Sequence, residues 1–340
     1  MTDRRDDPPG ETTAPGAAAR RGWLFGAAAL VALIVAALHF SDLERVTEMA
    51  RRARPAWLVL ALALQLLTYL ALARGWQAVL TVAGTPVPLG RLVRVAVAKL
   101  FADQMIPSAG MGGNVVLVDR LVALGVSRGT AVAALLVSMI GYYAAYALLA
   151  LVMLVVLWLH DRATPLLVGL VTSFLLVAIA IPALALWLRA RGSRPLPPRL
   201  EALPLLRTLL RIVGEAPRAL VADRRLIATV MACNAAVFLA DAATLAVCLH
   251  ALGQPLAPAT AFVALMAASI VVTLGPIPMG LGSFEATATA TLTMLGVGFE
   301  PAVAATLLFR GLALWLPLLP GLLLFRAAGA YPGRKRGEGR

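Results

Sequence analysis

The sequence predicts an all-α polytopic membrane protein, with an inverted-topology repeat, two re-entrant helical hairpins and about six full spans. Two observations predict the membrane. Hydrophobic residues make up 61% of the 340 residues, and several apolar runs reach the ~18 residues that indicate a spanning helix. A third observation predicts the repeat: two similar stretches of the chain each break at Pro and Gly residues.

Six apolar runs are expected to cross the membrane as full spans. They cover about 23–40, 56–73, 130–159, 164–188, 226–250 and 301–326. With the hairpins between them they form one transmembrane domain over about 23–330. A polar segment at 1–22 is expected to be a disordered tail, and 331–340 is a basic tail. The first run lacks a clear signal-peptide cleavage site, so we expect it to remain as a span.

Arginine placement predicts the orientation. The net charge is +13, and the 189–225 loop holds nine Arg against three acidic residues. Because Lys and Arg accumulate on the cytoplasmic side, this loop and both termini are expected there, in a bacterial plasma (inner) membrane. The loop at 41–55 is a counter-signal with four Arg. The larger loop decides the prediction.

Two stretches, 86–126 and 255–299, do not fit as simple spans and resemble each other. Gly84-Thr-Pro-Val-Pro aligns with Gly253-Gln-Pro-Leu-Ala, and the break at Pro107 aligns with that at Pro276 at the same offset. Repeat one covers about 56–159 and repeat two about 226–326. Because their first spans run in opposite directions, the repeats are inverted. Re-entrant hairpins fit the short arms; two short spans with a tight turn are the alternative.

The two breaks are candidate binding sites for an anionic headgroup. A helix that begins within the membrane presents free N–H groups and a positive dipole end, and glycines let a ligand approach the backbone. Alternatively, these glycines only permit tight turns and close helix packing. The candidate residues are Pro107, Gly112, Gly113 and Asn114 in the first hairpin and Pro276, Pro278, Gly280, Gly282 and Ser283 in the second.

Charged residues at membrane depth complete the candidate substrate site. Such charges are costly unless they are paired or hydrated. Lys99 and Asp103 can pair at a spacing of four residues, and Glu285 and Arg310 can pair between helices. The alternative is that these pairs only hold the hairpins in place. The hairpins also carry Asp119 and Arg120, and a span carries Asp241.

Several functional classes find no support in the sequence. It contains no HExxH motif, P-loop or GxSxG motif with a matched His, so no enzymatic activity is expected. The three His and two Cys residues show no metal-site spacing, so we expect no metal and no cofactor. The arginines flank apolar runs rather than forming a basic face with aromatic residues, which argues against nucleic acid as a partner. Tyr142, Tyr143 and Tyr146 form a cluster that could line a cavity, although packing is the expected role.

The sequence resembles the transmembrane region of lysylphosphatidylglycerol synthases, the flippase-like domain family, over about 20–330. The matching residues are Arg74-Gly-Trp76, Phe101 to Gly112-Gly113 through Pro107, Arg120 with Leu124-Gly125, the run from Pro276 to Glu285, and Gly296, Ala302, Arg310 and Trp315. The resemblance implies a lipid-translocating module of the bacterial plasma membrane. We expect a stand-alone member without the synthase domain.

The predicted function is therefore that of a lipid flippase or lipid transporter for an anionic or modified lipid. Membrane lipids are the expected partners, and a second copy of the chain or a lipid-biosynthetic enzyme are further candidates. Two alternatives remain. One is a small-solute or ion-coupled secondary transporter, and the other is a non-transporting accessory of an envelope-lipid enzyme that makes hopanoids or glycolipids.

Overall fold

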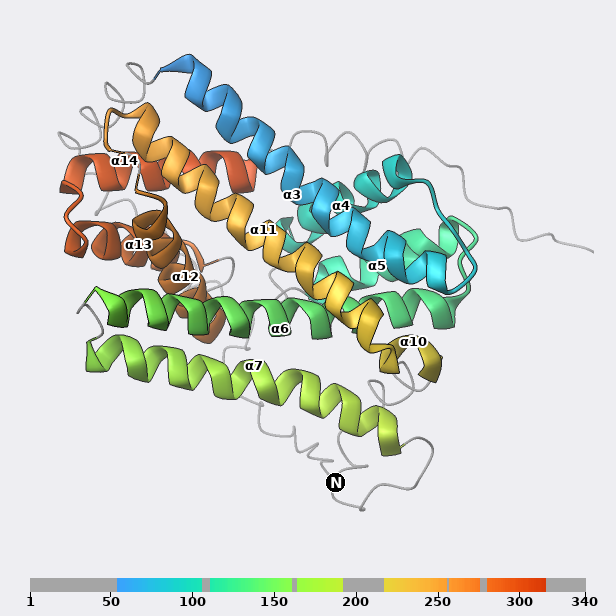
Figure 1. Cartoon of the computed structure of the whole chain (residues 1–340). Coiled ribbons are helices and arrows are strands. Elements are labelled where there is room, and N and C mark those ends of the chain that lie inside the picture. The colour runs from blue at the N-terminus through green and yellow to red at the C-terminus, as the bar shows by residue number, and fades with distance from the viewer. Residues whose placement is uncertain are drawn as a thin grey trace, which may run out of the picture. The chain divides into compact units, whose positions relative to one another are not determined.

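The computed structural model describes residues 54–105, 111–160, 164–191, 217–255, 257–275 and 280–315. Every regular element within these ranges is a helix (Figure 1), so the predicted all-α class is confirmed. The chain divides into two units, Met1–Glu48 and Met49–Arg340, and all described residues belong to the second. The predicted tail at 1–22 and the predicted span at 23–40 lie outside the described residues.

Four helices in these ranges are long and apolar enough to cross a membrane. They are α3 (Pro55–Val82), α6 (Arg128–Leu159), α7 (Pro165–Arg191, apolar over Pro165–Ala183) and α11 (Arg224–Ala251). They confirm that the runs predicted as spans at 56–73, 130–159, 164–188 and 226–250 form helices of spanning length and composition. α3 is longer than predicted and continues past Arg74 to Val82. Its 28 residues extend about 42 Å, so a bilayer core of about 30 Å requires tilt or protrusion.

Four shorter helices form two packed pairs. The first helix pair consists of α4 (Leu89–Met105) and α5 (Met111–Ala123), and the second of α12 (Pro258–Leu274) and α13 (Ser283–Met294). Their lengths of 17, 13, 17 and 12 residues agree with the short arms predicted for 86–126 and 255–299. The connecting residues 106–110 and 276–279, which include Pro107, Pro276 and Pro278, lie outside the described residues.

The predicted span at 301–326 is described only in its first part. α14 (Phe299–Arg310) passes directly into a π-helix, η2 (Gly311–Trp315), and the remainder lies outside the described ranges. In the predicted 189–225 loop, α7 extends to Arg191 and a short helix α10 (Arg218–Ala222) precedes α11.

α3 and α11 pack side by side and antiparallel along their length (Figure 1). The backbone N–H of Arg54 donates to the Ala251 carbonyl at 3.2 Å, and one turn further Trp57 stacks edge-on against His250. At the opposite end, Gly75 lies against Cys233. Contacts at both ends fix the register of the two helices.

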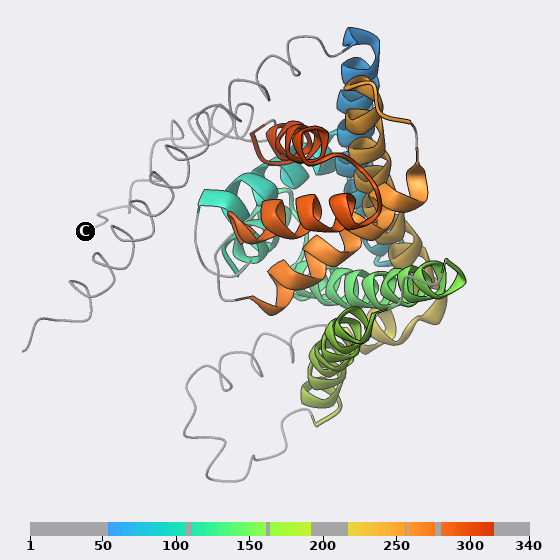
Figure 2. The ribbon, with the colours of Figure 1, turned by 90° about the vertical axis from the view of Figure 1, so that its left-hand side faces the viewer.

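Two hydrophobic cores lie on either side of this central helix pair. One contains Trp76, Leu92 and Leu121 and joins the first helix pair to α3 and the N-terminal half of α6. The other contains Leu245 and Met266 and joins the second helix pair to α11, α14 and the C-terminal half of α6. Figure 2 shows α12, α13 and α14 together, above α6 and α7. Each short helix pair therefore has its own core, and α6 and α11 contribute to both.

A glycine in the left-handed conformation follows each of four helices. Gly84 follows α3 and Gly253 follows α11, with φ of 73° and 83°. Gly125 follows α5 and Gly296 follows α13, with φ of 90° and 99°. This left-handed conformation, which ends helices and favours glycine, explains why glycine stands at all four positions.

Candidate functional site

Asp103 stands where the two helices of the first pair approach their connection. Its Oδ2 pairs with Lys99 Nζ at 2.6 Å, one turn earlier on α4. Its Oδ1 accepts the backbone N–H of Gly113, in the first turn of α5, at 2.9 Å. The predicted Lys99–Asp103 pair is confirmed. The carboxylate also lies at the positive end of the α5 dipole, which stabilises its charge.

Gly113 permits this close approach. A Cβ atom at Gly113 would overlap the Asp103 carboxylate. The glycine therefore makes room for a carboxylate of the protein itself. Its neighbours Gly112 and Asn114 are half-buried in the same turn.

Glu285 occupies a similar position in the second helix pair. Its Oε1 accepts from Arg310 Nε on α14 at 2.6 Å, and its Oε2 accepts the backbone N–H of Gly282 at 2.7 Å. The Arg310 guanidinium also lies 4.9 Å from the centre of the Phe284 ring, a cation–π contact. The predicted Glu285–Arg310 pair is confirmed. Both sites thus combine a carboxylate, a cation and a glycine N–H at a helix N-terminus.

The glycines of the second pair also shape its turn. Gly280 and Gly282 have φ of 62° and 81°, which favours glycine. A side chain at Gly280 would meet Val272 on α12. Ser283 donates its hydroxyl to the Gly280 carbonyl at 3.1 Å. Turning and close packing account for these positions, and their predicted role in binding a ligand stays a prediction.

A third polar group lies between α3 and α11. Gln65 Nε2 donates to Asp241 Oδ1 at 2.8 Å and approaches Thr244 Oγ1 at 3.4 Å. Within the described ranges Asp241 forms no ion pair, and the buried Tyr69 hydroxyl has no hydrogen-bond partner. A carboxylic acid in a spanning helix with a neutral amide partner is costly, so its presence points to function or hydration.

Tyr146, the most buried residue of the tyrosine cluster, has the packing role expected for it. Tyr146 is fully buried, and its ring lies against Phe174 and Phe238. Its hydroxyl lies 3.3 Å from Thr273 Oγ1 on α12. Tyr142, by contrast, is exposed. Tyr146 therefore contributes to the core between α6, α7 and α11.

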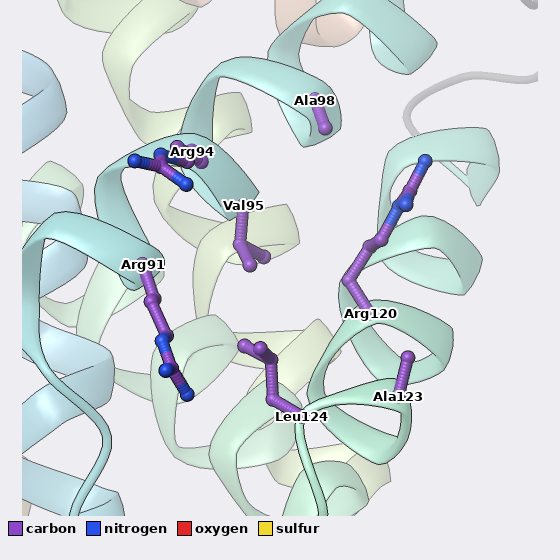
Figure 3. Close-up of a pocket in the computed structure, with 7 residues that line it drawn as sticks. All are labelled: Arg91, Arg94, Val95, Ala98, Arg120, Ala123 and Leu124. Atoms are coloured by element: carbon purple, nitrogen blue, oxygen red, sulfur yellow. The ribbon is translucent and has the colours of Figure 1, made fainter. Parts of the chain in front are cut away.

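A basic cavity lies at the other end of the first helix pair (Figure 3). Its volume is about 280 Å³, and it is lined by Arg91, Arg94, Val95, Ala98, Arg120, Ala123 and Leu124. Of its three arginines the sequence analysis selected only Arg120. The missed signal was the spacing of Arg91 and Arg94, which places both on one face of a short helix. Asp119, the neighbour of Arg120, is exposed and does not line the cavity.

A largely apolar groove runs between α13 and α14 and ends at Glu285. Its volume is about 620 Å³. The lining residues are Glu285, Ala286, Thr289, Ala290, Thr293, Met294, Phe299 and Val303. The groove therefore connects an apolar surface with the Glu285–Arg310 pair.

The fold and these sites define a polytopic helical membrane protein with partly buried ion pairs in two short helix pairs. The chain belongs to the family described as the lysylphosphatidylglycerol synthase TM region, whose model matches residues 23–321. Curated protein sequences give no match. The family resemblance noted in the sequence is thus confirmed, and it relates the chain to lipid metabolism or transport.

Proposed function

We propose that the protein moves an anionic or modified lipid across the bacterial plasma membrane. The observation that carries this proposal is the Glu285–Arg310 pair at the end of the apolar groove. A lipid has an apolar chain and a polar headgroup, and this arrangement offers a surface for each. Membership of this family also supports a role in moving lipid.

The proposed architecture is an inverted repeat with two re-entrant hairpins. Three features support it. α3 and α11, which begin the two halves, are antiparallel. Each of them contacts the first helix of the short pair that follows it, α4 or α12. The second helix of that pair, α5 or α13, then contacts the next helix along the chain, α6 or α14. Broken helices at the interface of inverted repeats are typical of secondary transporters.

The headgroup path is proposed to follow the two carboxylate sites. Each helix N-terminus is already hydrogen-bonded to Asp103 or Glu285. An anionic headgroup would therefore compete with a carboxylate for the glycine N–H or for the cation, Lys99 or Arg310. The displaced carboxylate stays attached to its helix, so it must be protonated or hydrated while the headgroup is bound.

The orientation is proposed from arginine content, with both termini and the 189–225 loop in the cytoplasm. Fusions of alkaline phosphatase and of a fluorescent protein after residues 205 and 335 test it. We expect fluorescence and no phosphatase activity at both sites. Phosphatase activity at either site would reject this orientation.

Asp241 favours a second candidate, an ion-coupled transporter. It is an acid in a spanning helix, and its described hydrogen-bond partner is the neutral Gln65. Such intramembrane acids mark ion and proton pathways in many transporters. Lipid transport driven by an ion gradient would unite both candidates.

Reconstitution into vesicles tests the proposed function. Fluorescent phosphatidylglycerol or phosphatidylethanolamine is placed in both leaflets, and a membrane-impermeant reductant bleaches the outer leaflet. If lipid moves, bleaching exceeds the outer-leaflet fraction. We expect movement with the parent and less with Glu285→Gln/Arg310→Gln, while Arg224→Gln on the exposed start of α11 behaves as the parent. A folded parent that moves no lipid would favour the non-transporting accessory.

A further inference from the structure

We infer that Arg91, Arg94 and Arg120 form a surface site for the phosphate of an anionic phospholipid, at the open end of the first helix pair. The role of this site rests on the proposed function: the site binds the lipid before the protein moves it across the membrane. It deepens that function by assigning a phosphodiester headgroup to a site distinct from the two carboxylate pairs.

The charge of the cavity supports an anionic ligand. Of the described residues, three arginines and no acidic residue line it. Across the described ranges, none of their three guanidinium groups forms a hydrogen bond or an ion pair. Because arginine presents a planar set of donors that matches a phosphate group, three uncompensated guanidinium groups are suited to a phosphate.

The position of the cavity matches the level of lipid headgroups. Arg91 and Arg94 lie in the first two turns of α4, and Arg120 lies in the last turn of α5. Asp103 and Gly113 meet at the opposite end of the same pair. α4 has 17 residues and is about 25 Å long. If the pair enters the bilayer by its connecting end, the arginines stay at the interface, where they attract anionic lipids.

The shape of the cavity favours a lipid over a free phosphate ion. In Figure 3 the three guanidinium groups stand apart, and Val95 and Leu124 lie between Arg91 and Arg120. Val95 and Ala98 are buried, so an apolar floor separates the cations. A phospholipid could place its phosphate at the arginines and its glycerol and first methylenes on the apolar floor.

Binding of phosphatidylglycerol to the purified full chain, measured by native mass spectrometry against phosphatidylcholine, tests the inference. The test variant is Arg91→Gln/Arg94→Gln/Arg120→Gln. Its folding control is the matching triple Lys variant, which keeps the charge. The matched surface control is Arg224→Gln/Arg225→Gln, which removes two exposed arginines from the first turn of α11.

The parent is expected to prefer phosphatidylglycerol. The triple Gln variant should raise the Kd for that lipid about tenfold, the triple Lys variant less, and the α11 variant should bind as the parent does. Unchanged binding by the triple Gln variant, or an equal loss in the α11 variant, overturns the site. If inorganic phosphate in excess stabilises the parent through these arginines and phosphatidylglycerol does not bind, the ligand is a free phosphate and the lipid assignment is wrong.

The vesicle assay separates this site from the proposed function. If the parent binds phosphatidylglycerol through the arginines but moves no lipid, the proposed function fails and the site stands. If the parent and the triple Gln variant bind and move lipid equally, the site fails and the proposed function stands.

Discussion

At the scale of single residues, the backbone N–H of a glycine binds a carboxylate in both helix pairs. Gly113 donates its N–H to Asp103, and Gly282 donates its N–H to Glu285. Each carboxylate also binds a cation, Lys99 or Arg310. Burying either carboxylate alone would be unfavourable, and the cation, the helix dipole and the N–H donor together offset that cost.

Gly113→Ala should destabilise the protein by about 1–3 kcal/mol, because the new methyl group overlaps the Asp103 carboxylate. Gly169→Ala on α7 is the matched control, since a Cβ there meets nothing within 4 Å. We expect it to leave stability unchanged or to raise it by up to about 1 kcal/mol, because alanine favours a helix interior over glycine. Thermal unfolding in detergent measures both. In an Asp103→Ala background, the cost of Gly113→Ala should shrink; an unchanged cost would show that the clash is with another group.

Arg310→Ala should destabilise by about 2–3 kcal/mol, the lower part of the range for breaking a buried pair, because 24% of the Glu285 side chain is exposed. Removing both charges in Glu285→Gln/Arg310→Gln should cost less than Arg310→Ala alone. The double variant leaves no unpaired charge, and the amide oxygen that it introduces at position 285 would still accept the Gly282 N–H. Unfolding midpoints compare the two variants. A double variant less stable than the single one would contradict this assignment.

At the scale of helices, the sequence predicted the elements that depend on residues close together in the chain. Apolar length defined α3, α6, α7 and α11, and Pro and Gly breaks defined the arms of both short helix pairs. The Lys99–Asp103 pair was predictable because both residues lie on one helix turn. The basic cavity was not recognised, because it forms only when the start of α4 meets the end of α5. The carboxylate contacts of Gly113 likewise depend on how two helices approach.

The antiparallel packing of α3 and α11 predicts a specific disulfide. A Cβ atom at Gly75 would lie 3.6 Å from Cys233 Cβ, within the range of about 3.5–4.5 Å found in disulfides. Mild oxidation of Gly75→Cys should therefore link α3 to α11. Trypsin cleavage in the Arg-rich 189–225 loop, followed by a non-reducing gel, detects the link.

Cys233→Ser in the same background is the control and should abolish the link, because Cys248 lies further along α11. Retention of the link in this control, or no link in Gly75→Cys, would contradict the register.

For the molecule as a whole, the described helices form two hydrophobic cores, and α6 and α11 contribute to both. Each short helix pair carries one partly buried carboxylate–cation pair near the start of its second helix. The proposed lipid path requires the two short helix pairs to enter from opposite sides of the membrane. A headgroup could then reach a charged pair from either leaflet.

Cysteine accessibility tests this opposed insertion most directly. Single cysteines at Pro86, Ser127, Pro255 and Gly298, all exposed, are introduced into a Cys233→Ser/Cys248→Ser background. Impermeant thiol reagents are applied to intact cells and to inverted membrane vesicles. We expect Pro86→Cys and Ser127→Cys to label from one face and Pro255→Cys and Gly298→Cys from the other. Labelling of all four from one face, or of the two members of a pair from opposite faces, would contradict the proposed inverted repeat and the lipid path that depends on it.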